Sequence, residues 1–458
     1  MQPGVDEAAR LVTKSGPSAT HHGALRRQMA KLTAPAGLGP TFNRVWAALT
    51  VSLIGSEITT LAISLIAATT LHASPFEAGL VAAASSLPML LLSLPAGVAV
   101  DMLPRRGVMI TTDIASAVII GVLPLAWLFD FLSIEVLCLV AFGVGTCAVF
   151  FEIAHYAFVP SIVTGDRVVD ANSRLQISYS ASDFIGPGLA GAIIQVLIAP
   201  IAVILDALSF LVSAMLLSRV EEKSARPMKD EQPTIRQALA GGLRFLVSEP
   251  TMRPIILLAS GTMIFNSALA AVQVLYLVRE LGFSALAIGA LFTIASVGAI
   301  PGAALARWSG ERFGVGVTII GGWALSSLSG IAIPLVGGSR VLAFITLGLT
   351  FATGAAAFTA ANVQQWTLRQ LLAPQSLGGR VTAGFRFAVQ GMGVIGTAGG
   401  GYLAGVIGMQ PALIIYAIGG ALVPLLGFLT PLRRVMTLPP PSNPPQPTES
   451  GEPPEVMA

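Results

Sequence analysis

Several acidic residues lie inside long apolar stretches of the sequence, where reversible protonation or the binding of a cation is the chemistry open to them: Glu57, Asp113, Glu152, Asp183 and Asp206. Ionising a carboxylate in hydrocarbon costs about 3 kcal/mol, so such residues usually face a protein interior or a water-filled cavity. Glu57 is the only charge between positions 45 and 71, within LIGSEITTLA. At 1.5 Å per helical residue, it lies roughly 20 Å from Arg44, and Asp183 roughly 13 Å from Arg174. Both would reach the central third of a membrane, which makes them the best candidates for a proton site.

The other three acids have different expected surroundings. Glu152 and His155 are three residues apart, so on a helix they share a face and would form a hydrogen-bonded pair. Such a pair would serve as a proton relay or would only stabilise packing, and the sequence does not distinguish these roles. Asp113 is expected to pair with nearby basic residues such as Arg106, and Asp206 to be hydrated near the outer membrane surface.

Uncharged polar residues in the second half of the chain could line a pathway or pack locally: Asn266, Gln273, Asn362, Gln364 and Gln365. Arg386 could stay deep or extend its side chain to the inner membrane surface, and the extension is favoured. The two cysteines, Cys138 and Cys147, lie in one apolar segment and indicate neither a disulfide nor a metal site. No cofactor or metal is expected.

These residues must be positioned by membrane helices. The chain has 458 residues, of which 54% are hydrophobic and only 11% charged, and its mean hydropathy is +0.79. Such a composition is typical of an integral membrane protein. Apolar runs long enough for a bilayer predict an all-α fold with twelve transmembrane helices in two pseudo-symmetric six-helix bundles, over residues 44–71, 75–100, 107–129, 134–160, 174–198, 200–218, 253–278, 284–306, 314–336, 341–367, 381–407 and 411–431.

Basic residues predict the orientation. Of 26 lysines and arginines, all but Arg279 and Arg340 fall on the side of the two termini. The positive-inside rule then places both termini in the cytoplasm of a multi-pass protein of the inner, or plasma, membrane. The net charge of +3 is explained by this asymmetry and does not argue for a nucleic-acid partner.

The spans predict five regions along the chain: an N-terminal cytoplasmic tail (1–42), a first bundle (43–218), a central cytoplasmic loop (219–252), a second bundle (253–432) and a disordered Pro-rich tail (433–458). Within the loop, Ile235, Leu239, Leu243 and Leu246 have roughly helical spacing and predict an amphipathic helix on the inner membrane surface. The halves also resemble each other at an offset of about 210 residues, which pairs IGPGLAG (185–191) with IGTAGGG (395–401) and Glu57 with Asn266. Repeats of this kind place a substrate between the halves near the midplane.

Two local motifs indicate a family. The loop AGVAVDMLPRRGV contains Gly97, Asp101, Arg105 and Arg106, and resembles the cytoplasmic loop signature of the major facilitator superfamily, with Met102 at its first basic position. There Gly97 would permit close helix approach, while Asp101 would cap a helix or pair with an arginine in a conformational gate that also includes Asp113. An ordinary basic loop is the alternative. In the second half, Ala306 replaces the acid.

The second motif lies in the fifth expected span. Its residues Gly186, Pro187, Ala190 and Gly191 resemble the Gly-Pro core that marks proton-coupled exporters of the superfamily, although Ala190 replaces one glycine. A proline among small residues would give a kinked, tightly sealed contact, and a plain packing face is the alternative. A closer resemblance is to the branch of the superfamily that contains the enterobactin exporter and macrolide efflux proteins. It is based on Gly55-Ser56-Glu57, FEAGLVAAASSLP (76–88), YAFVPSIV (156–163), DANSRLQIS (170–178) and GGLRFLVSEPTMR (241–253), and it covers roughly residues 43–432.

This resemblance implies a secondary active transporter that exports an amphipathic drug, antibiotic or siderophore by alternating access, with protons as the coupling ion. Its proton-coupling and substrate cavity would contain Glu57, Asp183, Glu152, His155, Asn266 and Gln273. Uptake on the same fold is an alternative, and a non-transporting membrane sensor or enzyme is one of a different class. The sequence contains no nucleophile elbow or phosphate loop, so no enzymatic activity is expected. The lipid bilayer and a small molecule are the expected partners; the oligomeric state is open, and a monomer is compatible with the sequence.

Overall fold

A computed structural model describes residues 38–163, 167–220, 235–374 and 377–438, and over these residues it contains helices and no strands. The predictions for the N-terminal tail to residue 37, for loop residues 221–234 and for the Pro-rich end from residue 439 lie outside the described residues.

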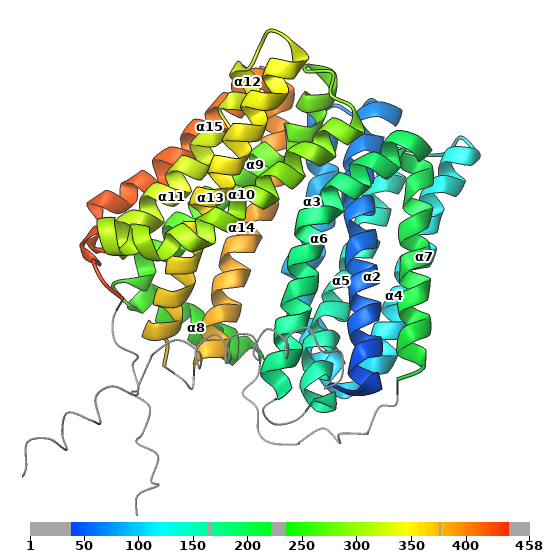
Figure 1. Ribbon diagram of the computed structural model, residues 1–458, viewed down its shortest axis with the longest axis horizontal. Helices are drawn as coiled ribbons and strands as arrows, with labels where there is room; N and C mark the ends of the chain where they lie inside the picture. The colour runs from blue at the N-terminus through cyan, green and yellow to red at the C-terminus, as the bar shows by residue number, and fades with distance from the viewer. Residues whose placement is uncertain (1–37, 164–166, 221–234, 375–376, 439–458) are drawn as a thin grey trace, which may run out of the picture.

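Two groups of helices stand side by side (Figure 1). The first comprises α2 (Gly39–Leu65) with the π-helix η2 (Ile66–Thr70), α3 (Pro75–Met102), α4 (Arg105–Leu128), α5 (Ile134–Ile162), α6 (Arg167–Leu197) and α7 (Ala199–Ser218). The second comprises α8 (Ile235–Ser248), α9 (Met252–Arg279), α10 (Ala285–Phe313), α11 (Val315–Ser329), α12 (Ala332–Leu335), α13 (Arg340–Leu372), α14 (Gly378–Ile407) and α15 (Met409–Leu425), with the 3-10 turns η3 (Leu426–Leu429) and η4 (Pro431–Arg434).

Helices cover all twelve expected spans, with α11 and α12 together covering 314–336. Eleven stretches of the described residues have the length and apolar composition to cross a membrane. The remaining expected span is α14, whose 30 residues include ten glycines and two arginines, Arg380 and Arg386. Glycine lengthens a helix but contributes little hydropathy, which is why α14 is helical although it is less apolar than the other spans. The predicted fold class is confirmed.

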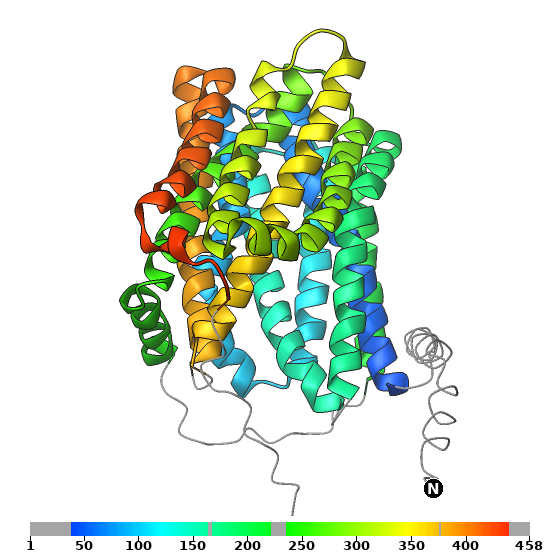
Figure 2. The ribbon, with the colours of Figure 1, turned by 60° about the vertical axis from the view of Figure 1, so that its left-hand side comes forward.

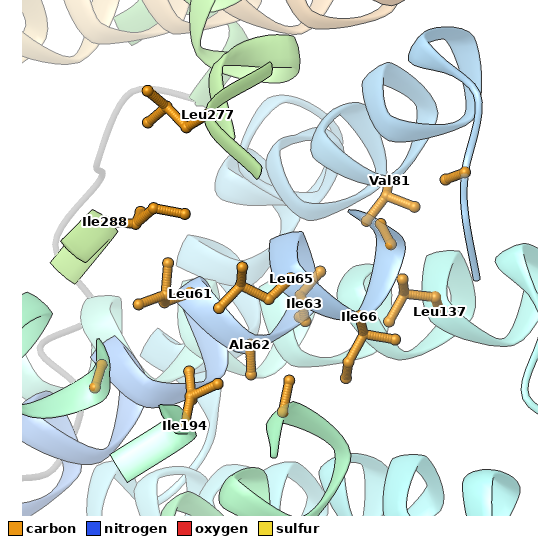
Figure 3. Packing of buried hydrophobic residues seen from close by; sticks show 14 of the residues in the cluster. Leu61, Ala62, Ile63, Leu65, Ile66, Val81, Leu137, Ile194, Leu277 and Ile288 are labelled. Carbon is orange, nitrogen blue, oxygen red and sulfur yellow. The ribbon is translucent and has the colours of Figure 1, made fainter. Parts of the chain in front are cut away.

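The apolar core shows where the two halves meet. We call the end of the bundles at which α2 begins the terminal end, and the opposite end, at which α2 ends, the distal end. One cluster of buried residues contains Leu61 and Ile194 of the first half together with Leu277 and Ile288 of the second, and these residues lie close together in Figure 3. Two further clusters, around Phe42 in one half and around Ile255 in the other, each contain residues of a single half. The halves therefore share a core towards the distal end and have separate cores elsewhere.

Local sequence signals explain how the distal turns form. Ser74, Ser133, Ser284 and Ser339 each accept a hydrogen bond from the backbone N–H three residues later and cap α3, α5, α10 and α13. The tight turn between α14 and α15 has Gly408 at φ 89°, and the turn between α6 and α7 has Ile198 at φ 60°, 210 residues earlier. A positive φ is easy for glycine and costly for a β-branched residue. The surrounding structure must therefore hold Ile198 in the conformation that Gly408 adopts at the equivalent position of the second half.

The helix predicted in the central loop is α8. Leu246 is fully buried in the core of the second half, and a Cβ added at Gly242 would overlap the backbone oxygen of Arg380. Helix α8 therefore packs directly on α14, as Figure 2 also shows. Its place at the inner membrane surface stays a prediction.

Candidate functional site

A cavity of about 730 Å³ lies between the halves and is the candidate functional site, here called the central cavity. The first half contributes Glu57 from α2 and Asp183 from α6, while the second contributes Gln273 from α9 and Phe292 from α10. Two acids that are 126 residues apart in the sequence thus line one chamber. A cavity lined by both halves is what the internal repeat predicts.

Glu57 is positioned by the glycine of the fifth-span motif. A Cβ added at Gly186 would overlap the Glu57 side chain at Cγ, so only glycine lets α6 lie against α2 at this height. Glu57 is half-buried and Asp183 is exposed to the cavity. Among the described residues, the ion pairs are Arg307–Glu311 and Arg386–Glu152, so neither cavity acid has a basic partner. Both carboxylates are available to a proton or to a cationic ligand group.

Two of the cavities that adjoin the central one are lined by polar residues of the predicted set. The first-half cavity, of about 610 Å³, lies among the first-half helices, is lined by Asp113, Glu152 and Asp206, and shares Thr60 and Ser64 with the central cavity. The second-half cavity, of about 540 Å³, is lined by Asn266, Asn362 and Gln365 among others and shares Phe358 and Thr359 with the central cavity. Each of these two cavities therefore shares a wall with the central cavity.

The polar residues of the second half divide by role. Asn266 accepts a hydrogen bond from Ser327 at 2.9 Å, and Asn362 accepts one from the indole of Trp323 at 3.1 Å. Gln364 faces away from the second-half cavity and donates to the backbone oxygen of Ala306 at 2.6 Å. Gln273 stands in the central cavity. Of this set, Asn266, Gln273, Asn362 and Gln365 line chambers, while Gln364 joins α13 to α10.

The expectation that Asp206 is hydrated is wrong. Asp206 has no exposed surface and accepts hydrogen bonds from Thr59 at 2.5 Å and from Ser209 at 2.9 Å. It lies at the contact of α2 with α7, where a Cβ added at Gly55 would overlap Asp206 and lie 2.8 Å from the Ser209 Cβ. A position near a helix end in the sequence does not make a side chain face water when another helix covers it.

We expect the Gly55→Ala substitution to lower the free energy of unfolding by about 1–3 kcal/mol, because the methyl group enters a buried, hydrogen-bonded contact. Gly121→Ala is the matched control, since a Cβ there meets no atom within 4 Å and should stabilise α4 by about 0.5–1 kcal/mol. Thermal unfolding of both variants in detergent measures the difference. Equal unfolding temperatures would contradict the α2–α7 contact.

Asp113 does not pair with the basic loop. It is 1% exposed, and its Oδ2 has no hydrogen-bond partner among the residues that the structure describes. Arg106 instead donates to the backbone oxygens of Leu217 and Ser218, at the end of α7. Helix C-termini carry unpaired carbonyls and a partial negative charge, so they compete with carboxylates for an arginine.

The contacts of the loop motif differ from those predicted in three further respects. A Cβ added at Gly97 would meet no atom within 4 Å, so this glycine does not mark a close helix approach. Asp101 is exposed, and no side chain caps the start of α4, whose N-cap residue is Pro104. Arg105 donates to the backbone oxygen of Ala157 in the last turns of α5 at 2.8 Å. The basic pair therefore connects α4 to the ends of α5 and α7.

Glu152 and His155 do not form a pair. His155 is 1% exposed, and its ring stacks on Phe151 with centroids 6.2 Å apart. Neither ring nitrogen has a hydrogen-bond partner within the described part of the chain. Glu152 accepts a hydrogen bond from Arg386 of α14 at 3.2 Å, across the two halves. This pair favours the alternative in which Arg386 stays deep over the extension of its side chain to the membrane surface. Three-residue spacing places two side chains on one face but leaves their χ angles free to direct them to different neighbours.

We expect the Glu152–Arg386 pair to contribute less than about 1 kcal/mol to stability, because the two side chains are 36% and 45% exposed and water screens them. A double-mutant cycle of Glu152→Gln and Arg386→Gln on thermal unfolding measures this coupling. The exposed intrahelical pair Arg307–Glu311 is the control. A coupling energy well above that of the control would show that the cross-half pair holds the halves together.

The fifth-span motif forms a contact between the halves. A Cβ added at Gly191 would lie 2.5 Å from the backbone oxygen of Ala285 and 3.0 Å from the Cα of Gly289, both in α10. A Cβ at Gly289 would in turn overlap the backbone oxygen of Pro187. Ala190 is fully buried. Three of the four motif residues thus divide between two neighbours: Gly186 faces Glu57 of α2, and Pro187 and Gly191 face α10.

Sequence reasoning missed a buried cation, Arg369 of α13, which is only 3% exposed. It follows Trp366 by three residues and Gln365 by four, so one helical face carries an aromatic ring, an amide and a guanidinium. That spacing was the available signal. Because Arg369 comes just after the expected span 341–367, it was counted with the basic residues of the cytoplasmic side.

Comparison with known proteins agrees with this architecture. A family model described as "Transmembrane secretion effector" matches residues 33–449. The chain is 24% identical over 399 residues to the uncharacterised MFS-type transporter YfiS of Bacillus subtilis strain 168, covering 83% of this chain and 90% of YfiS. It is 30% identical over 193 residues to the multidrug efflux pump Tap of Mycolicibacterium fortuitum, covering 40% of this chain and 46% of Tap.

Solved structures show the same fold at low identity. The nucleoside transporter NupG superposes with a TM-score of 0.66 at 13% identity, and the match covers 85% of this chain and 98% of NupG. A bacterial homologue of the lysosomal transporter Spinster gives 0.69 at 15% identity, with 87% and 98% coverage. A bacterial homologue of the iron transporter ferroportin gives 0.67 at 15%, with 85% and 98% coverage.

Proposed function

Because the chain belongs to the transmembrane secretion effector family of major facilitator transporters, and is therefore a multi-pass membrane protein, we propose that it exports an amphipathic small molecule in exchange for protons. The observation that carries the proposal is the central cavity, where Glu57 and Asp183 have no basic partner among the described residues. An acid in such a place binds either a proton or a hydrogen-bonding or cationic group of a substrate.

Coupling follows from this competition. A protonated carboxylate attracts a cationic or donor group less than an ionised one, so proton binding favours substrate release. The arrangement of the cores supports alternating access, since the halves share buried residues towards the distal end and separate towards the terminal end. Rocking about the central cavity would exchange the open and closed ends.

The proposed direction of transport is based on the distribution of basic residues and on the description of a related protein. Basic residues concentrate at the terminal end, which we assign to the cytoplasm of a cell whose plasma membrane holds the protein. A conformation closed at the distal end would then load substrate from the cytoplasm. Tap's description as a multidrug efflux pump supports drug export over uptake, through a match that spans about half of Tap.

The test uses inverted membrane vesicles, whose lumen corresponds to the cell exterior, and a panel of fluorescent amphipathic drugs. We expect an acidic lumen to drive accumulation of at least one drug, and a protonophore to abolish it. Accumulation that is unchanged by collapse of the gradient would rule out proton coupling. Accumulation only in right-side-out vesicles would show uptake instead of export.

A further inference from the structure

We propose that the second-half cavity binds an anionic group of the transported molecule through Gln365 and Arg369 of α13 and Thr262 of α9. The cavity would take an amphipathic molecule with an aromatic or other apolar body and a carboxylate, sulfonate or phosphate group. The inference rests on the proposed transport function for its biological role, but the binding itself is tested without transport.

Unpartnered donors gather at this cavity. The Nε2 of Gln365, the Oγ1 of Thr262 and both Nε and Nη1 of Arg369 are buried without a hydrogen-bond partner among the described residues. The three residues are 3%, 4% and 3% exposed, respectively. Gln365 and Thr262 line the cavity directly, and Arg369 lies one turn beyond Gln365 on the same face of α13. Leaving such groups unpaired costs about 1–3 kcal/mol each, more for a charged group, so a partner is expected in the functional cycle.

The guanidinium has no counterion within the part of the chain that the structure describes. Arg386 adds a like charge near Arg369, and the acid Glu152 is already paired with Arg386. A buried charge without a partner is strongly unfavourable, and arginine cannot become neutral by losing its proton. Two rings offset part of this cost, since the Arg369 Cζ lies 4.4 Å from the Phe385 ring centre and 5.8 Å from that of Trp366. The ring faces stabilise the positive charge, but they do not accept hydrogen bonds from the N–H groups that lie in the plane of the guanidinium.

Those donors select the ligand class. A guanidinium presents parallel N–H groups that match two oxygens of a carboxylate, sulfonate or phosphate. The Gln365 amide and the Thr262 hydroxyl add further hydrogen-bond donors for the same anion. The remaining wall contains the rings of Trp323, Phe358, Trp366 and Phe385. At about 540 Å³, the cavity has the size of an ordinary small-molecule site. Its shared wall with the central cavity, at Phe358 and Thr359, places a bound body beside the coupling acids.

The test measures binding of four probes with one ring system to the purified full chain in detergent: naphthalene-2-sulfonate, naphthalene-2-carboxylate, neutral 2-naphthalenemethanol and cationic 2-naphthylmethylammonium. Quenching of tryptophan fluorescence reports binding, because Trp323 and Trp366 line the cavity. We expect the two anions to bind about tenfold or more tighter than the neutral probe, which corresponds to about 1.4 kcal/mol. Arg369→Gln should remove this preference, and Arg369→Lys should retain part of it.

A stability measurement separates a binding role from a structural one. Arg369→Gln removes an unpaired buried charge, so the ligand-free variant should unfold at the same or a higher temperature than the native chain. Arg312→Gln, which changes an exposed arginine of α10, is the matched control and should leave anion preference intact. If Arg369→Gln does not fold, Gln365→Leu and Thr262→Val should each weaken anion binding severalfold.

Two results would overturn the inference: equal affinity of the native chain for anionic and neutral probes, or an anion preference that survives Arg369→Gln. Its failure is distinguishable from failure of the proposed function. Gradient-driven export of neutral or cationic drugs without anion binding would refute only the anion site. Anion binding lost in Arg369→Gln, with no transport of any drug in vesicles, would refute only the transport proposal.

Discussion

Replacement of Glu57 by glutamine is expected to remove the response of transport to the proton gradient while the protein stays folded. Glutamine has the shape of the acid, so it preserves the contact with Gly186, but it cannot gain or lose a proton at neutral pH. Coupling free energies between two sites are typically about 1–3 kcal/mol, or roughly 5- to 150-fold in affinity. Gradient-driven accumulation in inverted vesicles should therefore fall by a factor in this range.

Exchange without a gradient separates coupling from substrate binding. Glu57→Gln vesicles should still exchange labelled for unlabelled drug, because the cavity and its other polar residues are unchanged. Glu135→Gln is the control, since Glu135 is exposed in the first turn of α5 at the distal end. A Glu57→Gln protein that accumulates drug as the native chain does would remove Glu57 from the mechanism. Asp183→Asn would then be the decisive variant, as the other acid of the central cavity.

The sequence predicted the helices well because hydropathy is a property of contiguous residues. A run of about 20 apolar residues must be helical in a bilayer, whatever it packs against. Helix α14 shows the limit of this rule, since its glycines lower the hydropathy without breaking the helix. The π-helix η2 and the break between α11 and α12 were not predicted, because both depend on tertiary packing.

The partners of the polar residues could not be predicted, since they come from distant parts of the chain. Glu152 binds Arg386, which is 234 residues away, and Asp206 binds Thr59, which is 147 residues away. His155 lies next to Phe151 and Tyr156 although an acid stands three residues before it. Local spacing indicates which residues share a helical face. The neighbouring helix decides which of them finds a partner.

The internal repeat is visible in the glycine contacts between the two halves. Gly191 contacts Gly289, and Gly79 contacts Gly401. A Cβ added at Gly79 would lie 2.6 Å from the Cα of Gly401, and a Cβ added at Gly401 would lie 2.7 Å from the Cα of Gly79. The two pairs are related by the 210-residue offset of the repeat. Gly289 is the second-half equivalent of Gly79, and Gly401 is the equivalent of Gly191. Helix α6 therefore contacts α10 as α14 contacts α3. Each contact joins the two halves near the distal end, where Phe76 also meets Tyr402 with ring centres 6.2 Å apart.

The Gly401→Ala substitution should prevent the distal end from closing. The added methyl group would meet the backbone of Gly79 and of Pro75, which cannot yield as a flexible side chain does, so the halves must separate. We expect transport to fall about tenfold or more, as a shift of about 1.4 kcal/mol or more towards a distally open state would cause. Spin labels at Phe129 and Leu335, exposed distal residues of opposite halves, would report a longer distance.

Gly399→Ala tests whether the backbone contact, and not helix composition, is responsible. Gly399 lies two residues away on α14, and a Cβ there meets no atom within 4 Å. Both substitutions raise the helix propensity of α14 equally, so a general effect would appear in both variants. If only Gly401→Ala lengthens the distance between the labels and lowers transport, closure of the distal end depends on glycine at the α3–α14 contact. If the two variants behave alike, the shared apolar core holds the distal end without help from the glycines.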